Sequence, residues 1–268
     1  MSGVIVEATG PALVIRIDRP EAMNALDIES MKAIRAALEQ LERSDDHQVG
    51  ILTGTGTRAF CSGSDLKRTF PPDTSFASAY FGTFEASIDN GLYVRAIALD
   101  SLRLTKPLIA AVNGHCLAGG MELALAADLR IAAPSATFGL PEPKVGSMPA
   151  LGGIALLSRT IPAAVANKML LTGDRIDAAE AYRVGLVSDL VEHEELLPTA
   201  IKLAERICEN GPLAVKAIKA AARQSHDMPL TQAMRQEELY WGVLRDTADR
   251  IEGRTAFAEK RRPKWTGA

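Results

Sequence analysis

The sequence predicts an α/β fold whose first part alternates strands with helices and whose last part is helical. Three observations support this prediction. Short β-rich runs alternate with segments of helical periodicity through the first half of the chain. Helical periodicity then continues nearly to the last residue, and no Gly/Ser-rich linker separates the two halves. The 268 residues, of which 47% are hydrophobic, are enough to bury a substantial core.

The N-terminal segment predicts a β-hairpin followed by a helix. Residues 4–7 and 13–17 are β-rich, and Gly10 and Pro11 between them are typical of a turn. Asp27 is a suitable N-cap for the helix, because its carboxylate can accept a hydrogen bond from a first-turn backbone N–H. The apolar positions with helical spacing are Ile28, Met31, Ile34, Leu38 and Leu41.

Three further strands are predicted from short apolar runs over residues 49–53, 108–112 and 129–132. A helix over residues 119–127 opens with two glycines and connects the last two of these strands. This order of strands and helix indicates the α/β core.

The region between the first two of those strands is less regular. Residues 70–89 are rich in proline, serine and aromatic side chains, which favours a loop with a short helix. Another helix is expected to end before Lys106, because Lys106 precedes Pro107 and a residue before proline avoids helical geometry.

The second half of the chain is predicted to be mainly helical. Asp177 is a suitable N-cap for a short helix that ends at Gly185. A helical stripe ends before Gly211 and contains Leu197, Ile201, Ala204 and Ile207. Later helical patterns cover residues 213–224, 230–245 and 252–261. We expect this C-terminal segment to pack on the core or on another subunit.

Composition argues against several classes of protein. The net charge is −3, and Lys and Arg are scattered except at residues 260–262, so no stripe for nucleic acid is evident. The N-terminus lacks a secretory pattern, and the most apolar region, residues 108–133, carries charges that are costly in hydrocarbon. Three cysteines and four histidines without ligand spacing predict neither disulfides nor a metal site. We therefore expect a cytoplasmic protein without metal, nucleic acid or membrane partners.

Glu122 is the first candidate for chemistry. Its neighbours in residues 119–127 are nearly all small or apolar, and a buried carboxylate is costly unless it is paired, hydrogen-bonded or neutralised. One interpretation is structural, because the helix dipole favours negative charge in the first turn. The two glycines favour a functional interpretation, because they let backbone N–H groups approach a ligand. Amide donors beside a carboxylate suit an oxyanion site with an acid/base partner.

Glu142 is the second candidate. It lies between Pro141 and Pro143, which stiffen the chain and disfavour helix or central-strand structure. Alone, this pattern is typical of a solvated glutamate on a turn, but the apolar, glycine-rich residues 145–153 that follow favour a position facing a cleft. The small residues in segment 60–66 would also let backbone amides reach a ligand, although, taken alone, the segment is better explained as an ordinary strand-to-helix loop.

Three other patterns are less specific. Gly54 and Gly56 follow a strand, but the third glycine and the long helix of a dinucleotide-binding fingerprint are missing. Ser64 lacks the Gly-x-Ser-x-Gly context of a hydrolase nucleophile. Cys116 follows His115, and adjacent side chains usually point in different directions, which argues against a nucleophile pair.

Taken together, these segments resemble the enoyl-CoA hydratase/isomerase (crotonase) superfamily along nearly the whole chain. Each motif is weak singly, and their order and spacing carry the resemblance. The matching segments are residues 19–26, 59–66, 106–114, 118–123, 138–142, 171–173 and 256–261.

The resemblance implies a crotonase-like spiral of ββα turns in residues 1–195 and a helical C-terminal trimerisation region in residues 196–268. It implies a homotrimer or a homohexamer. It also implies an acyl-CoA substrate in which coenzyme A is part of the thioester, with no tightly bound cofactor.

The resemblance also implies roles for residues of the site. By position, the backbone N–H groups of Ser64 and Gly119 would bind the thioester carbonyl oxygen, although alanine is common at the first of these positions. Glu122 would handle water and Glu142 the α-proton. The positions implied to contact coenzyme A are Met23, Ser62, Ser64, Asp65, Leu66, Lys67 and Gly119, with Phe257 and Lys260 from this subunit or a neighbour.

The implied reaction is addition or removal of water across the α,β bond of an enoyl-CoA. The presence of both glutamates favours this reaction over those of relatives that lack one carboxylate. An enoyl-CoA isomerase and a non-catalytic acyl-CoA-binding homologue stay open as alternatives. Residues 140–146, 161–164 and 251–265 are similar to the carnitinyl-CoA dehydratase subgroup, and the acyl group itself stays open.

Overall fold

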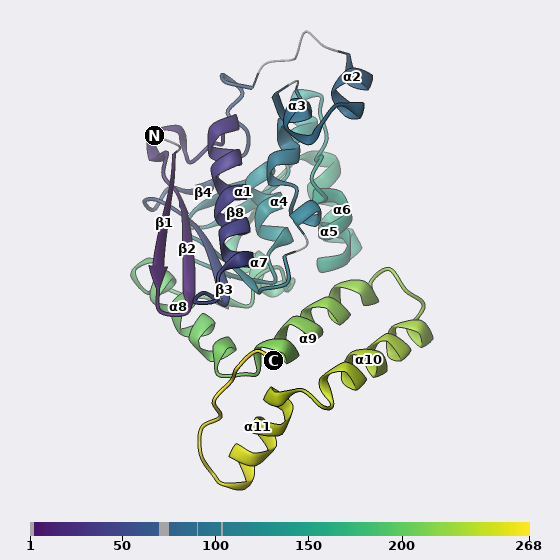
Figure 1. Cartoon of the computed structure of the whole chain (residues 1–268). Helices are drawn as coiled ribbons and strands as arrows, with labels where there is room; N and C mark the ends of the chain where they lie inside the picture. The colour runs from purple at the N-terminus through teal and green to yellow at the C-terminus, as the bar shows by residue number, and fades with distance from the viewer. Residues whose placement is uncertain (1–2, 70–74, 90, 103) are drawn as a thin grey trace.

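The computed structural model describes residues 3–69, 75–89, 91–102 and 104–268 (Figure 1). Two sheets form the core of this described part. The six-stranded sheet contains β1 (Val4–Thr9), β2 (Ala12–Ile17), β3 (Val49–Gly54), β5 (Leu108–Val112), β7 (Leu129–Ala132) and β10 (Asp189–Leu190), in that order. The four-stranded sheet contains β4 (Ala59–Cys61), β6 (His115–Leu117), β8 (Thr137–Gly139) and β9 (Ile176–Asp177).

Successive strand pairs alternate between the two sheets. β3, β5 and β7 belong to the six-stranded sheet, while β4, β6 and β8, which directly follow them, belong to the other. The chain therefore winds as a spiral in which each turn contributes one strand to each sheet. This arrangement confirms the predicted α/β fold with repeating ββα turns.

The first two strands form the predicted hairpin. β1 and β2 pair antiparallel, with Thr9 opposite Ala12 across the turn at Gly10 and Pro11. From β2 to β10 the pairing in this sheet is parallel. Every residue of β3 and β5 is buried, as expected for central strands covered on both faces.

Local capping fixes where two of the helices begin. α1 (Ile28–Arg43) starts at the predicted N-cap, where the Asp27 carboxylate accepts from the backbone N–H of Ser30 at 2.9 Å. α7 (Ala178–Arg183) starts in the same way at Asp177, whose partner is the N–H of Glu180 at 2.8 Å. The other α-helices are α2 (Phe76–Phe81), α3 (Phe84–Asp89), α4 (Gly119–Ala126), α5 (Gly153–Thr160), α6 (Ala163–Thr172), α8 (His193–Cys208), α9 (Pro212–Ser225), α10 (Leu230–Leu244) and α11 (Ala248–Ala258).

Helical structure ends before Lys106, as predicted. It consists of two 3₁₀ helices, η2 (Tyr93–Ile97) and η3 (Leu99–Leu102). The structure places α2 and α3 in the second part of the irregular region at 70–89, and residues 70–74 lie outside the described residues. The tighter turns fit a short connection that must bring α3 back to the buried strand β5.

The C-terminal helices divide into two groups. The buried face of α8, with Leu196, Ala200 and Ala204, packs on the six-stranded sheet beside Ile51 and Ile109. In contrast, α9, α10 and α11 extend away from the sheets (Figure 1). The predicted division between residues 195 and 196 falls inside α8, and the division stays a prediction.

A buried lysine holds the end of α1. The Nζ of Lys106 donates to the backbone oxygens of Leu41 (2.8 Å), Ser44 and His47 (2.7 Å), and so links the last turn of α1 to the loop that follows it. Lys219 of α9 donates to the Lys106 carbonyl and pairs with Asp128 at 2.8 Å. These contacts attach α9 to the core.

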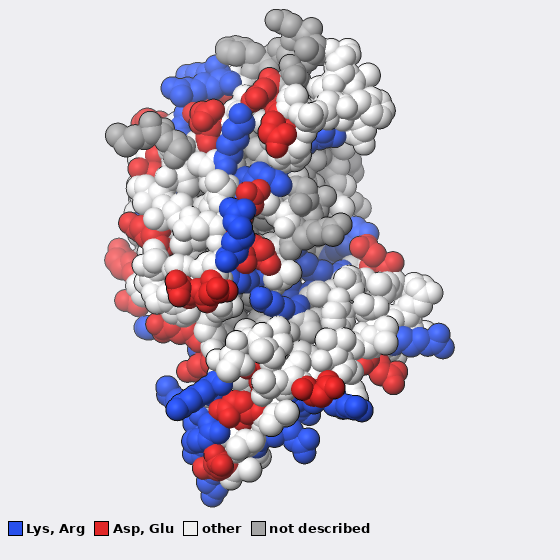
Figure 2. All heavy atoms as spheres, viewed as in Figure 1, with Lys and Arg blue, Asp and Glu red and all other residues white. Residues whose placement is uncertain are grey.

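Charged side chains of both signs are intermingled on the face shown in Figure 2. Among the helices that the structure describes, none is both long and apolar enough to cross a membrane.

Candidate active site

Two backbone segments meet at the N-terminal end of α4. Gly63 has φ 94°, and a Cβ built on it would lie 2.7 Å from the Cβ of Ala118 and 3.2 Å from the nitrogen of Gly119. A side chain at Gly63 would therefore block the approach. Within the described residues, the backbone N–H groups of Ser64 and Gly119 have no acceptor in the protein. The arrangement places two free amide donors in neighbouring segments, as an oxyanion site requires.

Hydrogen bonds on both sides hold Ser64 in place. The N–H of Leu26 donates to the Gly63 carbonyl, and the N–H of Asp65 donates to the Leu26 carbonyl, each at 2.8 Å. The Arg19 guanidinium pairs with the Asp65 carboxylate at 2.9 Å and holds its pKa below the usual range. Asp65 thus fixes the loop through its side chain, a role that the sequence did not reveal.

Two asparagines fix the strand that leads to this loop. The side-chain amides of Asn24 and Asn113 both donate to the Ala59 carbonyl, at 2.7 and 3.0 Å. Asn113 also accepts from the N–H of Gly54 at 3.0 Å. Asn24 and Asn113 are nearly fully buried, so these bonds are protected from competition with water. Both residues lie in the motifs that carried the family resemblance, but their partners are distant in sequence.

The first turn of α4 packs directly on β4. A Cβ on Gly120 would lie 2.3 Å from the Cys61 carbonyl oxygen, so glycine is required there. Ala118, the residue before the helix, has φ 49° and ψ −128°. Such a conformation costs a non-glycine residue about 1–3 kcal/mol, and the surrounding packing must maintain it. The turn exposes the Gly119 N–H instead of burying it against β4.

Glu122 is buried, with 4% of its surface exposed. Its Oε1 accepts from the backbone N–H groups of Leu151 at 2.6 Å and Gly153 at 3.0 Å. A Cβ on Gly153 would lie 2.9 Å from this oxygen, so a small residue is needed for the contact. Burial raises the pKa of Glu122, while the amide donors act in the opposite direction. The amides of Leu151 and Gly153 thus orient the carboxylate through Oε1.

Glu142 lies in η4 (Glu142–Val145), a single 3₁₀ turn that accommodates Pro143 near its start. Its Oε2 is buried and has no hydrogen-bond partner within the described ranges. Burial raises its pKa to about 7, and the nearby charge of Glu122 acts in the same direction. A carboxyl group with a pKa near neutrality can both give and take a proton under physiological conditions.

The structure brings several of the predicted binding residues together. Ser62 donates from its backbone N–H to the Met23 carbonyl at 3.2 Å, so these two residues adjoin the oxyanion loop. Leu66 and Lys67 follow Ser64 and are exposed. A ligand bound at the oxyanion loop therefore has accessible side chains beside it.

Phe257 and Lys260 are not brought to this site within one chain. Phe257 is 86% exposed on α11, which lies in Figure 1 at the end of the molecule remote from α4. It lines a separate pocket of about 680 Å³ together with Trp241 and Trp265. Their predicted role therefore depends on a neighbouring subunit.

The cysteines do not form a nucleophilic site. Cys61 and Cys116 are buried, and burial raises the pKa of Cys61 to about 12. His115 contacts Thr137 through Nδ1 at 2.7 Å. In the described part of the chain, no group of three or more His, Cys, Asp or Glu side chains is arranged to hold a metal ion.

Comparisons with known proteins identify the family of the chain. The family described as "Enoyl-CoA hydratase/isomerase" matches residues 7–268. (E)-Benzylidenesuccinyl-CoA hydratase of Thauera aromatica is 44% identical over 99% of each chain. Carnitinyl-CoA dehydratase of Salmonella enteritidis PT4 is 38% identical over 96% of each chain. The crystal structure of enoyl-CoA hydratase from Mycobacterium tuberculosis H37Rv superposes with a TM-score of 0.86, at 39% identity and complete coverage of both chains.

Proposed function

The chain belongs to the enoyl-CoA hydratase/isomerase family and is a hydratase-type lyase acting on CoA thioesters, and from this premise we propose how its own residues perform the reaction. In this proposal, the N–H groups of Ser64 and Gly119 bind the thioester oxygen, while Glu122 and Glu142 move water and the α-proton. The observation that carries the proposal is the buried, unpartnered Oε2 of Glu142 close to the oriented carboxylate of Glu122.

The two amides act on the charge that develops during the reaction. Addition of water at the β-carbon turns the thioester into an enolate, with negative charge on its oxygen. The N–H groups of Ser64 and Gly119 are fixed by the surrounding backbone, so little reorganisation is needed to stabilise that charge. Removal of one such donor typically lowers the rate about 100- to 1,000-fold.

The two glutamates divide the proton transfers. The amides of Leu151 and Gly153 hold Oε1 of Glu122, so Oε2 is the oxygen that accepts from the attacking water. Glu142, whose pKa is raised to about 7, delivers the proton to the α-carbon in hydration and removes it in dehydration.

Coenzyme A enters the reaction as part of the substrate. We propose that its pantetheine and nucleotide parts lie along Met23, Ser62, Asp65, Leu66 and Lys67, with Phe257 and Lys260 supplied by a neighbour. The names of the two relatives specify benzylidenesuccinyl and carnitinyl thioesters. These names favour a substituted acyl group over a plain alkyl chain for this enzyme as well.

We propose that the enzyme is a cytoplasmic homotrimer or homohexamer assembled through α9, α10 and α11. Large apolar side chains are exposed on these helices, and such a concentration in water favours association. They are Ile218, Leu230, Met234, Leu239, Trp241, Val243, Ile251 and Phe257. Assembly would also carry Phe257 and Lys260 towards the site of another subunit.

The test is a hydration assay that follows loss of the enoyl-thioester absorbance. Glu122→Gln and Glu142→Gln should each lower kcat about 100- to 10,000-fold, because each removes one acid/base group. Binding of saturated butyryl-CoA should change only a few-fold. Glu194→Gln, an exposed position on α8, is the matched control. Unchanged turnover in either site variant would remove that residue from the mechanism.

A further inference from the structure

Arg95 is a half-buried arginine with no carboxylate partner among the described side chains. It lies on η2, and its guanidinium carbon stands 4.8 Å from the centre of the Tyr80 ring. Arg35 makes a similar contact, 4.3 Å above the Phe84 ring, but it also pairs with Glu39 at 3.0 Å. A guanidinium withdrawn from water normally has an anionic partner. Among the described side chains, none takes that position at Arg95.

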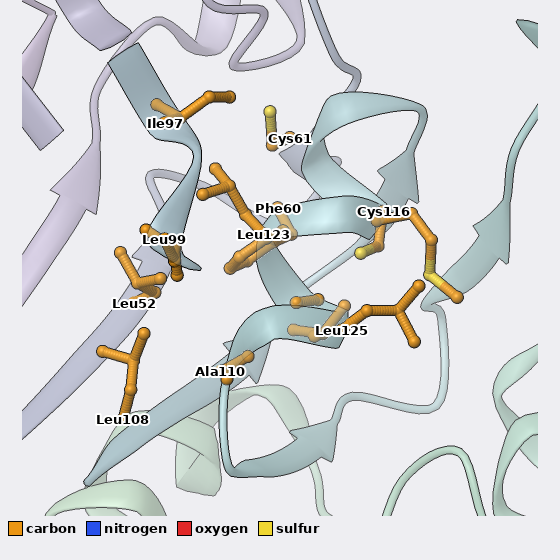
Figure 3. Close-up of a cluster of buried hydrophobic side chains, with 14 of the residues drawn as sticks. Leu52, Phe60, Cys61, Ile97, Leu99, Leu108, Ala110, Cys116, Leu123 and Leu125 are labelled. Carbon is orange, nitrogen blue, oxygen red and sulfur yellow. The ribbon is translucent and has the colours of Figure 1, made fainter. Parts of the chain in front are cut away.

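The helix that carries Arg95 forms a wall of the active site. The Cδ1 of Ile97 lies 4.0 Å from the position that a Cβ on Gly119 would occupy. Figure 3 shows Ile97 on one side of the buried cluster, facing Cys61. Because a 3₁₀ helix rises about 2 Å per residue, the backbone of Arg95 lies about 4 Å along the η2 axis from Ile97. With three residues per turn, the Arg95 side chain leaves the helix on a neighbouring face, where it contacts Tyr80.

The negative charges of the site determine where a cation could assist substrate binding. Glu122 and Glu142 repel a substrate that carries a second carboxylate, so its binding requires a cation placed away from the reacting carbons. The planar guanidinium can hold a carboxylate through two parallel N–H bonds. The contact with the Tyr80 ring restricts the guanidinium, so less freedom is lost when the anion binds.

We propose that Arg95, positioned by Tyr80, binds a second carboxylate carried by the acyl group of the substrate. The inference rests on the proposed hydratase function and specifies the substrate class of the same site. It also disfavours a quaternary ammonium on the acyl group. An aromatic ring is suited to such a cation, but Arg95 already covers the Tyr80 ring.

Three enoyl thioesters that differ only at their terminal carbon test the proposal. Crotonyl-CoA carries hydrogen there, glutaconyl-CoA a carboxylate and crotonobetainyl-CoA a trimethylammonium group. The wild-type enzyme should have its highest kcat/KM for glutaconyl-CoA and its lowest for crotonobetainyl-CoA. In Arg95→Gln, the ratio of kcat/KM for glutaconyl-CoA over crotonyl-CoA should fall about 10- to 100-fold, as expected for loss of a charged hydrogen bond.

Two controls separate recognition from a structural effect. Arg35→Gln removes the paired arginine and should leave the ratio within about two-fold of wild type. Tyr80→Phe keeps the ring and should retain the preference, whereas Tyr80→Leu should reduce it. An equal loss for glutaconyl-CoA and crotonyl-CoA in Arg95→Gln would overturn the proposal, and so would a wild-type enzyme without preference for the carboxylate.

A binding measurement separates this inference from the proposed hydration. Calorimetry with glutaryl-CoA and butyryl-CoA asks the same question without turnover. One outcome is that none of the three enoyl thioesters is hydrated, but Arg95→Gln still loses the preference for binding glutaryl-CoA. In that case the hydratase mechanism fails and the carboxylate site stands. If hydration proceeds and the glutaryl-CoA preference is the same in both proteins, Arg95 has no such role.

Discussion

The region around α4 and the region of α9, α10 and α11 are built on opposite principles. Around α4, backbone segments approach so closely that a methyl group on Gly63 or Gly120 would meet neighbouring atoms below 3 Å. Among the described residues, the groups without a partner there include Oε2 of Glu142 and the backbone N–H groups of Ser64 and Gly119. On the C-terminal helices, large apolar side chains such as Trp241 face solvent.

Hydrogen bonds tie the C-terminal tail to α11 and to the end of α8. The Asp249 carboxylate accepts from the N–H groups of Thr266 at 2.7 Å and Gly267 at 3.0 Å. The Trp265 indole donates to the Glu209 carbonyl at 2.9 Å and packs on Gly253. The candidate site is thus surrounded by close packing within one chain, whereas the C-terminal helices leave large apolar side chains exposed.

Gly120→Ala should have the largest effect, because it disrupts the packing of α4 on β4. The added methyl would lie 2.3 Å from the backbone oxygen of Cys61, so α4 must shift and carry the Gly119 donor with it. We expect kcat to fall about 100-fold or more and stability to fall by about 1–3 kcal/mol. The hydration assay and urea denaturation measure the two effects. Wild-type turnover would show that the close packing of α4 on β4 does not set the rate.

Trp241→Glu should weaken the association of subunits through the C-terminal helices. The side chain is 57% exposed in the single chain, and a charge there would oppose burial against a partner. Aromatic anchors at interfaces commonly contribute about 2 kcal/mol or more, so assembly should weaken at least about 30-fold. Sedimentation velocity measures the oligomeric state. Gln232→Glu, at an exposed position on the same helix, is the control. An unchanged oligomer would place the interface elsewhere.

Glu142→Gln should make the protein more stable at alkaline pH, although it lowers kcat. The pKa of Glu142 is raised from 4.5 to about 7, so the folded chain binds this proton more tightly than the unfolded chain. The stabilisation of the wild type is therefore complete below pH 4.5 and is lost as the pH rises through 7.

Glutamine stays neutral, so the variant should exceed the wild type by about 1–2 kcal/mol at pH 8 and match it near pH 4.5. Urea titrations at the two pH values measure the difference, and Glu194→Gln provides the control without a buried carboxyl. Equal stabilities at pH 8 would mean that Glu142 does not titrate as a buried acid.

Gly242→Ala should have the smallest effect, a slight increase in stability. Gly242 lies in the last turn of α10, and a Cβ there meets no atom within 4 Å in the single chain. The better helix propensity of alanine should therefore stabilise the protein by about 0.5–1 kcal/mol, opposite in sign to Gly120→Ala. Thermal unfolding measures the gain. A loss of stability would indicate that another subunit contacts this glycine closely.

The sequence predicted the elements that local chemistry decides. The caps at Asp27 and Asp177, and the hairpin at Gly10, each depend on residues within a few positions of one another, and all are confirmed. The three-residue strands β4, β6 and β8 were not predicted, because such runs are too short to show an alternation. The helices α5 and α6 were also missed, since nearby glycines and prolines obscured their starts.

For the site, the sequence indicated the residues but not their surroundings. Glu122 and Glu142 were singled out from their neighbours, yet the amides of Leu151 and Gly153 that orient Glu122 lie about thirty positions away and carry no side-chain signal. The setting of Arg95 was equally hidden, because its aromatic partner belongs to another element. Contacts made by the backbone, or between distant elements, leave no periodic trace in the sequence.

The burial of Lys106 has a practical consequence for chemical labelling. Its amine donates to carbonyls of Leu41, Ser44 and His47 and is closed off from solvent, and the side chain of Lys219 nearby is only 7% exposed. A mild amine-acylating reagent should thus spare both lysines in the folded enzyme while it modifies exposed Lys67. Their appearance as modified peptides in mass spectrometry would report, residue by residue, when α1 and α9 come apart.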